Sequence, residues 1–255
     1  VEWNQWQFVS SCIDSMNSGA DNDYLWYRSK FKHTWEGSLK GYEGLGKIIV
    51  NGGSVSSSQN KIEIKDADDV LFLMDIRLLK EASTSLVPLM KNKLSSLNMS
   101  YNELKDRNIK VHGEFFNRSS FDITPENQVQ SDAEISVKNA RDSVTNAMIE
   151  NVFYASRYNI LCATGFYPPN LQGIWTGTWT PPWSGDFTND GNVNVAISSF
   201  LSANMPELMQ SYFDYHSGKM NDYRENATKL FGCRGIILPS HSSTNGYNFH
   251  FGETW

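Results

Sequence analysis

The residues best suited to chemistry gather in one stretch, from Pro168 to Pro206. Flat indole rings offer large apolar faces with one polar N–H, and neutral amides and hydroxyls offer directional hydrogen bonds. A sugar suits that combination, because its ring has apolar C–H faces and a rim of hydroxyls. A phosphate or nucleic-acid ligand is not indicated, because no Lys or Arg occurs between Arg157 and Lys219. The stretch contains Trp175, Trp179 and Trp183 among Asn170, Gln172, Thr176, Thr178, Asp186, Asn189, Asp190, Asn192 and Asn194.

Prolines and glycines interrupt helical spacing in this stretch, and the residues do not alternate as in a strand. We therefore expect a long ordered loop, and loops on a rigid scaffold are where binding residues concentrate. A second interpretation stays open on composition alone. In it, the tryptophans pack the loop onto its own domain and the asparagines cap turns.

The same stretch carries an ordered series of short motifs: Asn170–Trp175 (NLQGIW), Pro181–Trp183 (PPW), Phe187–Thr188 (FT) and Asn192–Asn194 (NVN). This series resembles the signature of glycoside hydrolase family 95, the inverting α-L-fucosidases and α-L-galactosidases. The resemblance runs from about Trp35 to Thr254, although proteins of the family are several times longer. It implies a glycoside hydrolase that cleaves terminal α-linked fucose or a related sugar.

The resemblance also implies roles for single residues. Asn192 and Asn194 match the two asparagines that hold and polarise the attacking water, and we expect them on one side of an extended segment. The alternative is N-capping of the helix that begins there. The substrate-binding residues that we expect are Asn170, Gln172, Trp175, Trp179, Trp183, Asp186 and His241.

The chain departs from the family pattern at the point where catalysis needs an acid. Inversion requires a general acid and a base roughly 6.5–9.5 Å apart, on opposite faces of the sugar. In the family the acid is a Glu far downstream, and this chain ends before it. The acids available here are Asp186, Asp190, Glu207, Asp214 and Glu253. The alternative function is therefore a non-catalytic carbohydrate-binding or structural fragment that lacks the downstream acid residues.

The first part of the chain, residues 1–80, reads as β-rich. Lys61–Lys65 alternates strictly between charged and apolar residues, and Val70–Ile76 is a nearly continuous apolar run that predicts a buried strand. Asn51–Gly53 (NGG) marks a turn between strands. We expect an antiparallel sheet from about Tyr24 to Arg77, with a turn in the polar segment before it. By resemblance, it is the end of an N-terminal β-sandwich.

Helical spacing dominates the rest. Residues 81–132 are expected to form a helical linker, with a helix at about 101–116 that begins in a capping box at Ser100 and Glu103. In residues 133–255 we expect helices at about 133–162, 193–203, 207–223 and 225–233. Successive helices with functional loops resemble a partial (α/α)6 toroid, the catalytic fold of the family. The expected fold class is therefore α+β.

Composition limits the partners. The chain has 255 residues and a net charge of −6 without an acidic block, so nucleic acid and anionic membranes are not expected partners. The 3 cysteines are widely spaced, and His241 and His250 have no third ligand in pattern, so no metal and no cofactor are expected. We expect a glycan substrate, self-association or packing against a missing C-terminal portion, and a secreted or periplasmic location.

Overall fold

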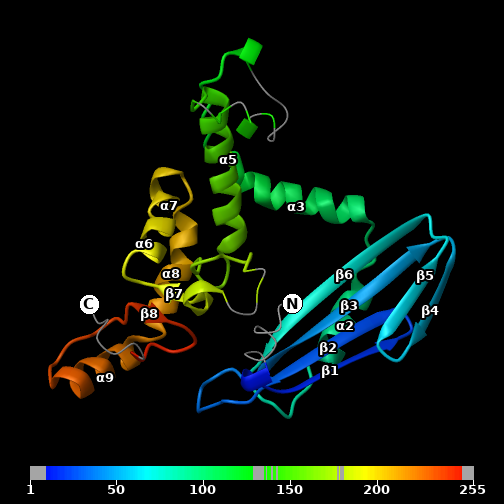
Figure 1. The fold of residues 1–255 in the computed structure, drawn as a ribbon, viewed down its shortest axis with the longest axis horizontal. Coiled ribbons are helices and arrows are strands. Elements are labelled where there is room, and N and C mark those ends of the chain that lie inside the picture. Colours follow the sequence, from blue (N-terminus) through cyan, green and yellow to red (C-terminus); the bar gives the residue numbers. More distant parts are fainter. Residues whose placement is uncertain are drawn as a thin grey trace. The chain divides into compact units, whose positions relative to one another are not determined.

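The computed structural model describes residues 10–128, 135, 137–138, 140–141, 143–176, 178 and 181–248 (Figure 1). The chain divides into two compact units, Val1–Lys105 and Asp106–Trp255. We call them the strand unit and the helical unit. Together they confirm a mixture of antiparallel strands and helices. The finer division at residues 80 and 132 stays a prediction.

The strand unit is built on one antiparallel sheet. Its strands are β1 (Ile13–Asp21), β2 (Tyr24–Phe31), β3 (Gly41–Asn51) and β6 (Asp69–Leu79), paired in that order. Strands β4 (Ser54–Ser58) and β5 (Lys61–Lys65) form a separate hairpin.

Glycines make the turn between β3 and β4. Gly52 and Gly53 connect these strands with φ angles of 72° and 64°, which a glycine adopts without steric cost. The turn predicted at Asn51–Gly53 is therefore confirmed. β1 was missed by the sequence analysis, which expected a turn within its polar segment.

Helix α2 (Val87–Ser96) covers one face of the sheet, and Pro88 lies in its first turn, where a missing N–H costs nothing. Met90 and Leu94 of the helix are buried against Tyr24 and Leu45. Burying side chains of this size contributes roughly 1.5–3 kcal/mol each. This cluster is the hydrophobic core of the strand unit.

An ion pair between the buried Glu43 and the largely buried Arg28 fixes the connection that leads from β6 to α2. Glu43 is 1% exposed and accepts hydrogen bonds from Arg28 Nη1 at 2.7 Å, Ser85 Oγ at 3.1 Å and the Leu86 amide at 2.5 Å. Arg28 Nη2 also donates to the carbonyl of Ala82 at 2.7 Å. Because every acceptor oxygen of the carboxylate has a donor, the charge can be buried without a large penalty.

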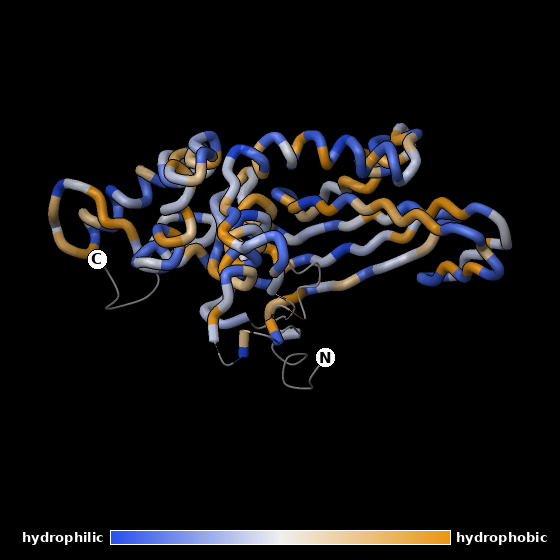
Figure 2. The backbone as a smooth tube through the Cα atoms, turned by 90° about the horizontal axis from the view of Figure 1, so that it is seen from above, coloured by the Kyte–Doolittle hydropathy of each residue, from blue (hydrophilic) through white to orange (hydrophobic). Residues whose placement is uncertain are grey.

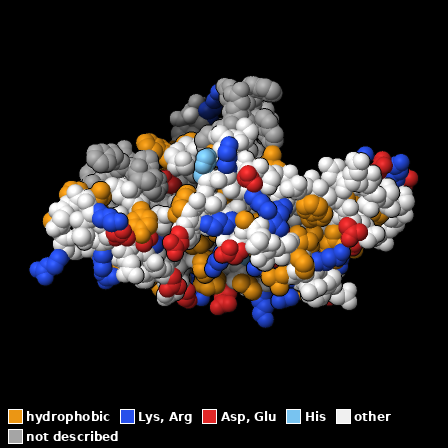
Figure 3. All heavy atoms as spheres, turned by 90° about the horizontal axis from the view of Figure 1, so that it is seen from below, with side chains coloured by type: hydrophobic (Ala, Val, Ile, Leu, Met, Phe, Trp, Pro, Cys, Tyr) orange, Lys and Arg blue, Asp and Glu red, His pale blue; other side chains and the backbone are white. Residues whose placement is uncertain are grey.

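The other face of β6 is open. Alternate apolar side chains along the strand are between 49% and 60% exposed, namely Val70, Phe72, Met74, Ile76 and Leu78. Figure 2 shows hydrophobic residues along the strands, and Figure 3 shows hydrophobic side chains at the surface of the strand unit. The prediction of a buried strand at Val70–Ile76 is therefore right for the strand and wrong for the burial of one side.

Within the described residues, the helical unit consists of helices and two short strands, and its first helix, α3 (Tyr101–Phe116), begins at the end of the strand unit. The elements that follow are η1 (Glu126–Gln128), α5 (Asn146–Ala163), η2 (Pro182–Gly185), β7 (Phe187–Thr188), α6 (Asn192–Ile197), α7 (Ser199–Ser202), η3 (Pro206–Leu208), α8 (Met209–Ser217), α9 (Met220–Phe231) and β8 (His241–Ser242). The predicted capping box is confirmed: Ser100 N donates to Glu103 Oε2 at 2.7 Å, and Glu103 N donates to Ser100 Oγ at 3.3 Å.

Several predicted helix boundaries are wrong. α5 begins at Asn146 rather than Ala133, because Thr145 is extended and its side chain accepts from the Met148 amide as an N-cap. The helix expected at 207–223 is broken near Gly218 into α8 and α9, and α9 contains nearly all of the helix expected at 225–233 and ends at its C-cap residue, Gly232.

Arg157 joins α5 to two other parts of the helical unit. This buried guanidinium donates to the carbonyl of Phe116 at 2.7 Å, to that of Ala203 at 2.8 Å and to that of Phe115. Burial lowers the pKa of Arg157, with the nearby Arg118 charge as a second cause. Arg157 therefore ties the end of α3 and the end of α7 to one helix. The core beside it contains Val193, Ile197, Phe200 and Met205.

Candidate functional site

Two short strands bring distant parts of the helical unit together. β7 and β8 pair antiparallel, with Phe187 opposite Ser242 and Thr188 opposite His241. The backbone N–H of Asn189 continues the pairing by donating to the carbonyl of Ser240 at 2.6 Å. The tryptophan-rich loop is thereby attached to the loop that carries His241.

A buried acid–imidazole pair lies at this junction. His241 Nδ1 and Asp186 Oδ2 are 3.0 Å apart, and both side chains are less than 9% exposed. Thr188 Oγ1 donates to the other carboxylate oxygen, Asp186 Oδ1, at 2.8 Å. A carboxylate on one ring nitrogen sets the orientation of an imidazole and the position of its protons. Asp186 therefore acts on His241, and its own oxygens are already engaged.

Trp183 covers the imidazole. The two ring centroids are 5.3 Å apart and the ring planes are inclined by only 11°, so the rings are stacked. Trp183 is nevertheless 60% exposed, so much of its indole remains open to solvent. An indole with one face supported and another exposed is suited to receive the apolar face of a ligand ring.

The backbone that presents Trp183 is strained. Trp183, Ser184 and Gly185 are consecutive residues with φ angles of 54°, 59° and 62°, in the left-handed region. Two side-chain amides hold this turn: Gln172 Nε2 donates to the carbonyl of Pro182 at 2.9 Å, and Asn170 Nδ2 donates to that of Gly185 at 2.7 Å. These two predicted substrate-binding residues therefore have their amide donors bound to the loop itself.

A cavity of about 310 Å³ opens beside the stacked rings. We call it the loop pocket. A volume near 300 Å³ is at the small end of ligand sites. The described residues that line it combine apolar surface with hydroxyl, amide and carboxylate groups and include no Lys or Arg: Leu171, Trp183, Thr188, Asp190, Asn192, Ser240 and His241.

The family is identified by sequence comparison. The family described as "Glycosyl hydrolase family 95 catalytic domain" matches residues 100–253, which is more than half of the chain. This chain belongs to glycosyl hydrolase family 95. The resemblance seen in the loop motifs is therefore confirmed at the level of the family.

A solved structure gives a fold relationship. A protein provisionally named a kojibiose phosphorylase, from human microbiome, is similar over 91% of this chain with a TM-score of 0.53 and 13% sequence identity. The family 95 chain spans only 29% of the length of that protein. No curated protein matches the sequence.

The two motif asparagines do not lie as predicted. Asn192 and Asn194 are the first and third residues of helix α6, where positions two apart point to different sides, so the expected extended segment is wrong. Neither side chain caps the helix, because the N-cap residue is Gly191. Asn192 lines the loop pocket, whereas Asn194 Nδ2 donates to the carbonyl of Asn189 at 3.0 Å.

The candidate acids are separated by the fold. Asp190 lines the loop pocket and is exposed, while Asp186 is buried behind His241. Glu207 accepts two hydrogen bonds from Arg118, at 2.8 and 2.9 Å, and Asp214 accepts from Gln210. Within the described residues, the loop pocket is thus lined by a single carboxylate. The remaining candidate, Glu253, lies outside the described residues.

Sequence reasoning found some of the pocket and missed the rest. Trp183, Asn192 and His241 were predicted and lie together, and Trp175 is half exposed without lining the pocket. Trp179 lies outside the described residues. Leu171, Thr188 and Ser240 were missed; for Leu171 and Thr188, the family motifs that contain them were the available signal.

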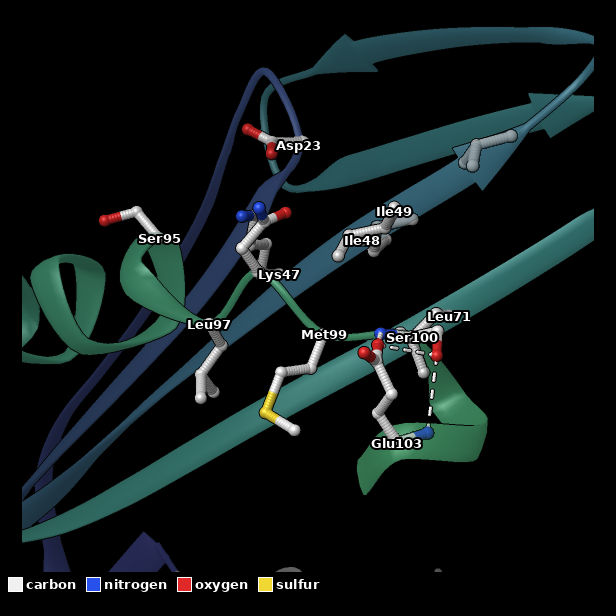
Figure 4. Close-up of a pocket in the computed structure, with 12 residues that line it drawn as sticks. Asp23, Lys47, Ile48, Ile49, Leu71, Ser95, Leu97, Met99, Ser100 and Glu103 are labelled. Carbon is white, nitrogen blue, oxygen red and sulfur yellow. Dashed lines mark hydrogen bonds between the residues drawn. The ribbon is translucent and has the colours of Figure 1, made fainter. Parts of the chain in front are cut away.

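A second cavity, of about 740 Å³, lies in the strand unit between β3, β6 and the segment from Ser95 to Glu103 (Figure 4). Glu103 points toward Ser100 there and is engaged in the capping box. Its carboxylate is thus already used by the backbone, which makes this cavity a weaker candidate than the loop pocket.

In the described part of the chain, no group of three or more His, Cys, Asp or Glu could hold a metal ion, and no helix could span a membrane.

Proposed function

We propose that this chain contributes the sugar-binding part of a family 95 glycoside hydrolase that removes terminal α-linked L-fucose, or a related sugar, with inversion. The observation that carries the proposal is the loop pocket. It offers an exposed indole stacked on a buried Asp–His pair, together with neutral hydroxyl and amide groups. A neutral pyranose matches these groups better than an anion does, because the described residues of the lining include no Lys or Arg.

The proposed role of each residue follows from its position in or beside the loop pocket. Trp183 stacks on the apolar face of the sugar, and His241, fixed by Asp186, faces the same cavity. Asn192 holds the attacking water through its side-chain amide at the start of α6, and Asn194 supports the turn before the helix. Asp190, the carboxylate at the pocket, is positioned to accept a proton or bind a sugar hydroxyl.

The second candidate function is sugar binding without turnover by this chain alone. It is favoured by the single carboxylate that the described residues place at the loop pocket, because inversion uses an acid and a base on opposite faces of the sugar. Hydrolysis would then require a further acid from a longer chain. Binding and hydrolysis must therefore be measured separately.

Two assays on the 255-residue chain test the proposal. Calorimetric titration with L-fucose measures binding, and release of nitrophenol from 4-nitrophenyl α-L-fucoside measures hydrolysis. We expect Asn192→Ala to weaken binding or abolish any hydrolysis, and the exposed Asn102→Ala in α3 to change neither. L-Fucose binding without hydrolysis supports the second candidate. Absence of binding to L-fucose and to L-galactose removes both.

The fold proposals follow from the family and from the open surfaces. We propose that the sheet is one half of a β-sandwich and that α5 to α9 begin an (α/α)6 toroid. The half-exposed face of β6 supports the first, because an apolar face of this kind needs a covering layer. Without that layer we expect the chain to self-associate, and Phe72→Ser should lower its sedimentation coefficient toward that of a monomer.

We also propose export to a secreted or periplasmic location, the usual setting of glycan-degrading enzymes. Fractionation of cells that make the native protein tests this proposal. Recovery with the cytoplasmic fraction would exclude it.

A further inference from the structure

One buried hydroxyl at the loop pocket has no hydrogen-bond partner among the residues that the structure describes. Ser240 is 2% exposed, and within the described residues its Oγ makes no hydrogen bond. Its backbone is well held, because its carbonyl accepts from the Asn189 amide at 2.6 Å. The side chain lines the loop pocket together with His241 and Trp183. An isolated buried hydroxyl is unfavourable, and nearly all such groups in native proteins are paired.

Ser242, two residues farther along, shows what a structural serine looks like here. It is fully buried, and its Oγ contacts Asn189 Nδ2 and Tyr215 Oη, each at 2.8 Å. Tyr215 donates its own hydrogen to the carbonyl of Ser243 at 2.8 Å, so the Ser242 hydroxyl is the donor between the two side chains. Both the donor and the acceptor capacity of Ser242 are therefore used inside the protein.

Two polar side chains of the same junction are engaged, whereas the buried Asn189 Oδ1, like Ser240 Oγ, makes no hydrogen bond within the described residues. Thr188 Oγ1 donates its hydrogen to Asp186, and Asp186 in turn contacts His241. Ser240 lines a cavity large enough for a ligand ring, and its buried Oγ has one donor and free acceptor capacity. A neutral hydroxyl is the matching ligand group, because it too can both donate and accept.

We propose that Ser240 is a specificity-determining residue of the loop pocket, whose Oγ hydrogen-bonds one ring hydroxyl of the bound sugar. The inference rests on the proposed function and adds to it one binding residue, Ser240, and the type of ligand group that it binds, a hydroxyl. A ligand that lacks this hydroxyl leaves Ser240 buried and unpaired, and sites of this kind discriminate strongly against such analogues. The geometry therefore assigns Ser240 to recognition rather than to folding.

The test compares Ser240→Ala with Ser242→Ala in the 255-residue chain. Urea unfolding measures stability, and calorimetric titration with L-fucose measures affinity. We expect Ser240→Ala to be at least as stable as the wild type, because it removes an unpaired buried hydroxyl, and to bind L-fucose at least 10-fold more weakly. We expect Ser242→Ala to unfold at a lower urea concentration, because it removes one buried hydrogen bond from Asn189 and one from Tyr215.

Monodeoxy analogues of L-fucose identify the hydroxyl. One of them should bind the wild type as weakly as L-fucose binds Ser240→Ala, and should lose nothing further in that variant. Equal L-fucose affinity in the wild type and Ser240→Ala overturns the inference alone. Wild-type affinity for every monodeoxy analogue overturns it without any variant. Absence of L-fucose binding by the wild type overturns the proposed function and this inference together.

Discussion

Substitutions at Asn170 and at Ser184, two residues that act on the left-handed turn at Trp183, should change the stability of the protein in opposite directions. Trp183 and Ser184 both have positive φ angles, 54° and 59°. The left-handed conformation costs roughly 1–2 kcal/mol for each residue with a Cβ, so the pair stores about 2–4 kcal/mol. The amide of Asn170 opposes this strain through its bond to the carbonyl of Gly185 at 2.7 Å.

The expected magnitudes follow from these terms. Asn170→Ala should lower the free energy of unfolding by about 1 kcal/mol, the net value of one hydrogen bond. Because the loosened turn no longer fixes Trp183 over His241, we expect L-fucose affinity to fall about fivefold, which is also about 1 kcal/mol. Ser184→Gly should stabilise by about 0.5–1 kcal/mol, since relief of strain exceeds the added freedom of the unfolded chain.

The double variant Asn170→Ala with Ser184→Gly is the decisive measurement. Glycine at position 184 removes half of the left-handed cost, so the turn should re-form without the Asn170 amide and most of the lost affinity should return. Urea unfolding and calorimetric titration with L-fucose follow the two quantities. The control is Ser95→Gly in helix α2, where glycine should destabilise by about 0.5–1 kcal/mol.

Two results would contradict this reasoning. If Ser184→Gly is less stable than the wild type, the turn is not strained as its φ angles indicate. If the double variant binds L-fucose no better than Asn170→Ala, the Asn170 amide does not act through the turn. In that case Asn170 contacts the ligand directly, as the sequence analysis first proposed.

Two further predictions concern the units themselves. Glu43→Gln should destabilise the strand unit by about 3 kcal/mol in urea, because it leaves the largely buried Arg28 charge without its anionic partner. Glu63→Gln, which removes an exposed 3.7 Å pair, should change stability by less than about 1 kcal/mol. Burial, with the Lys219 charge as a second cause, lowers the pKa of His216 to about 4. The unfolded chain binds this proton near pH 6.5 and the folded chain does not, so stability should fall as the pH falls from 6.5 toward 4, by about 1 kcal/mol at pH 5 after allowance for solvent screening. Thermal unfolding between pH 7 and 5 should show this loss in the wild type and not in His216→Gln, and equal pH profiles would contradict it.

Periodicity and turn chemistry predicted most of the elements. Alternation at Lys61–Lys65 and the NGG turn at Asn51–Gly53 predicted β5 and the β3–β4 connection correctly. β1 was missed because its sequence, IDSMNSGAD, lacks an apolar alternation, and its strand form comes from pairing with β2. α5 was predicted too long because apolar spacing does not reveal that Thr145 adopts an extended cap.

The site was predictable in part, for a similar reason. The motifs of the loop identified Trp183 and Asn192 as residues of one region. The contact between Asp186 and His241 joins residues 55 positions apart, through strands of only two residues each, and no local pattern announces such a pairing. Ser240 was missed because its importance lies in the partner that it lacks, which only the packing around it can show.

The hydrogen bonds around β8 also connect helix α8 to the start of helix α6. Asn189 Nδ2 donates to Ser242, Ser242 donates to Tyr215, and Tyr215 donates to the carbonyl of Ser243. Burial raises the pKa of Tyr215, so its hydroxyl remains a donor at neutral pH. The carbonyl of Asn189, held at one end of this series, is the group that binds Asn194 Nδ2.

This series has a direction, since each hydroxyl accepts one hydrogen and donates its own, and reversing it would leave the carbonyl of Ser243 without its donor. Tyr215 in α8 is therefore linked to Asn194 of α6 through Ser242 and Asn189. A substitution such as Tyr215→Phe should leave the Ser242 hydroxyl without its acceptor and the carbonyl of Ser243 without its donor, while Asn189 Nδ2 keeps its bonds to Ser242 and to the carbonyl of Pro239. Activity changes caused by residues of α8 would then be effects on positioning, because none of them lines the loop pocket.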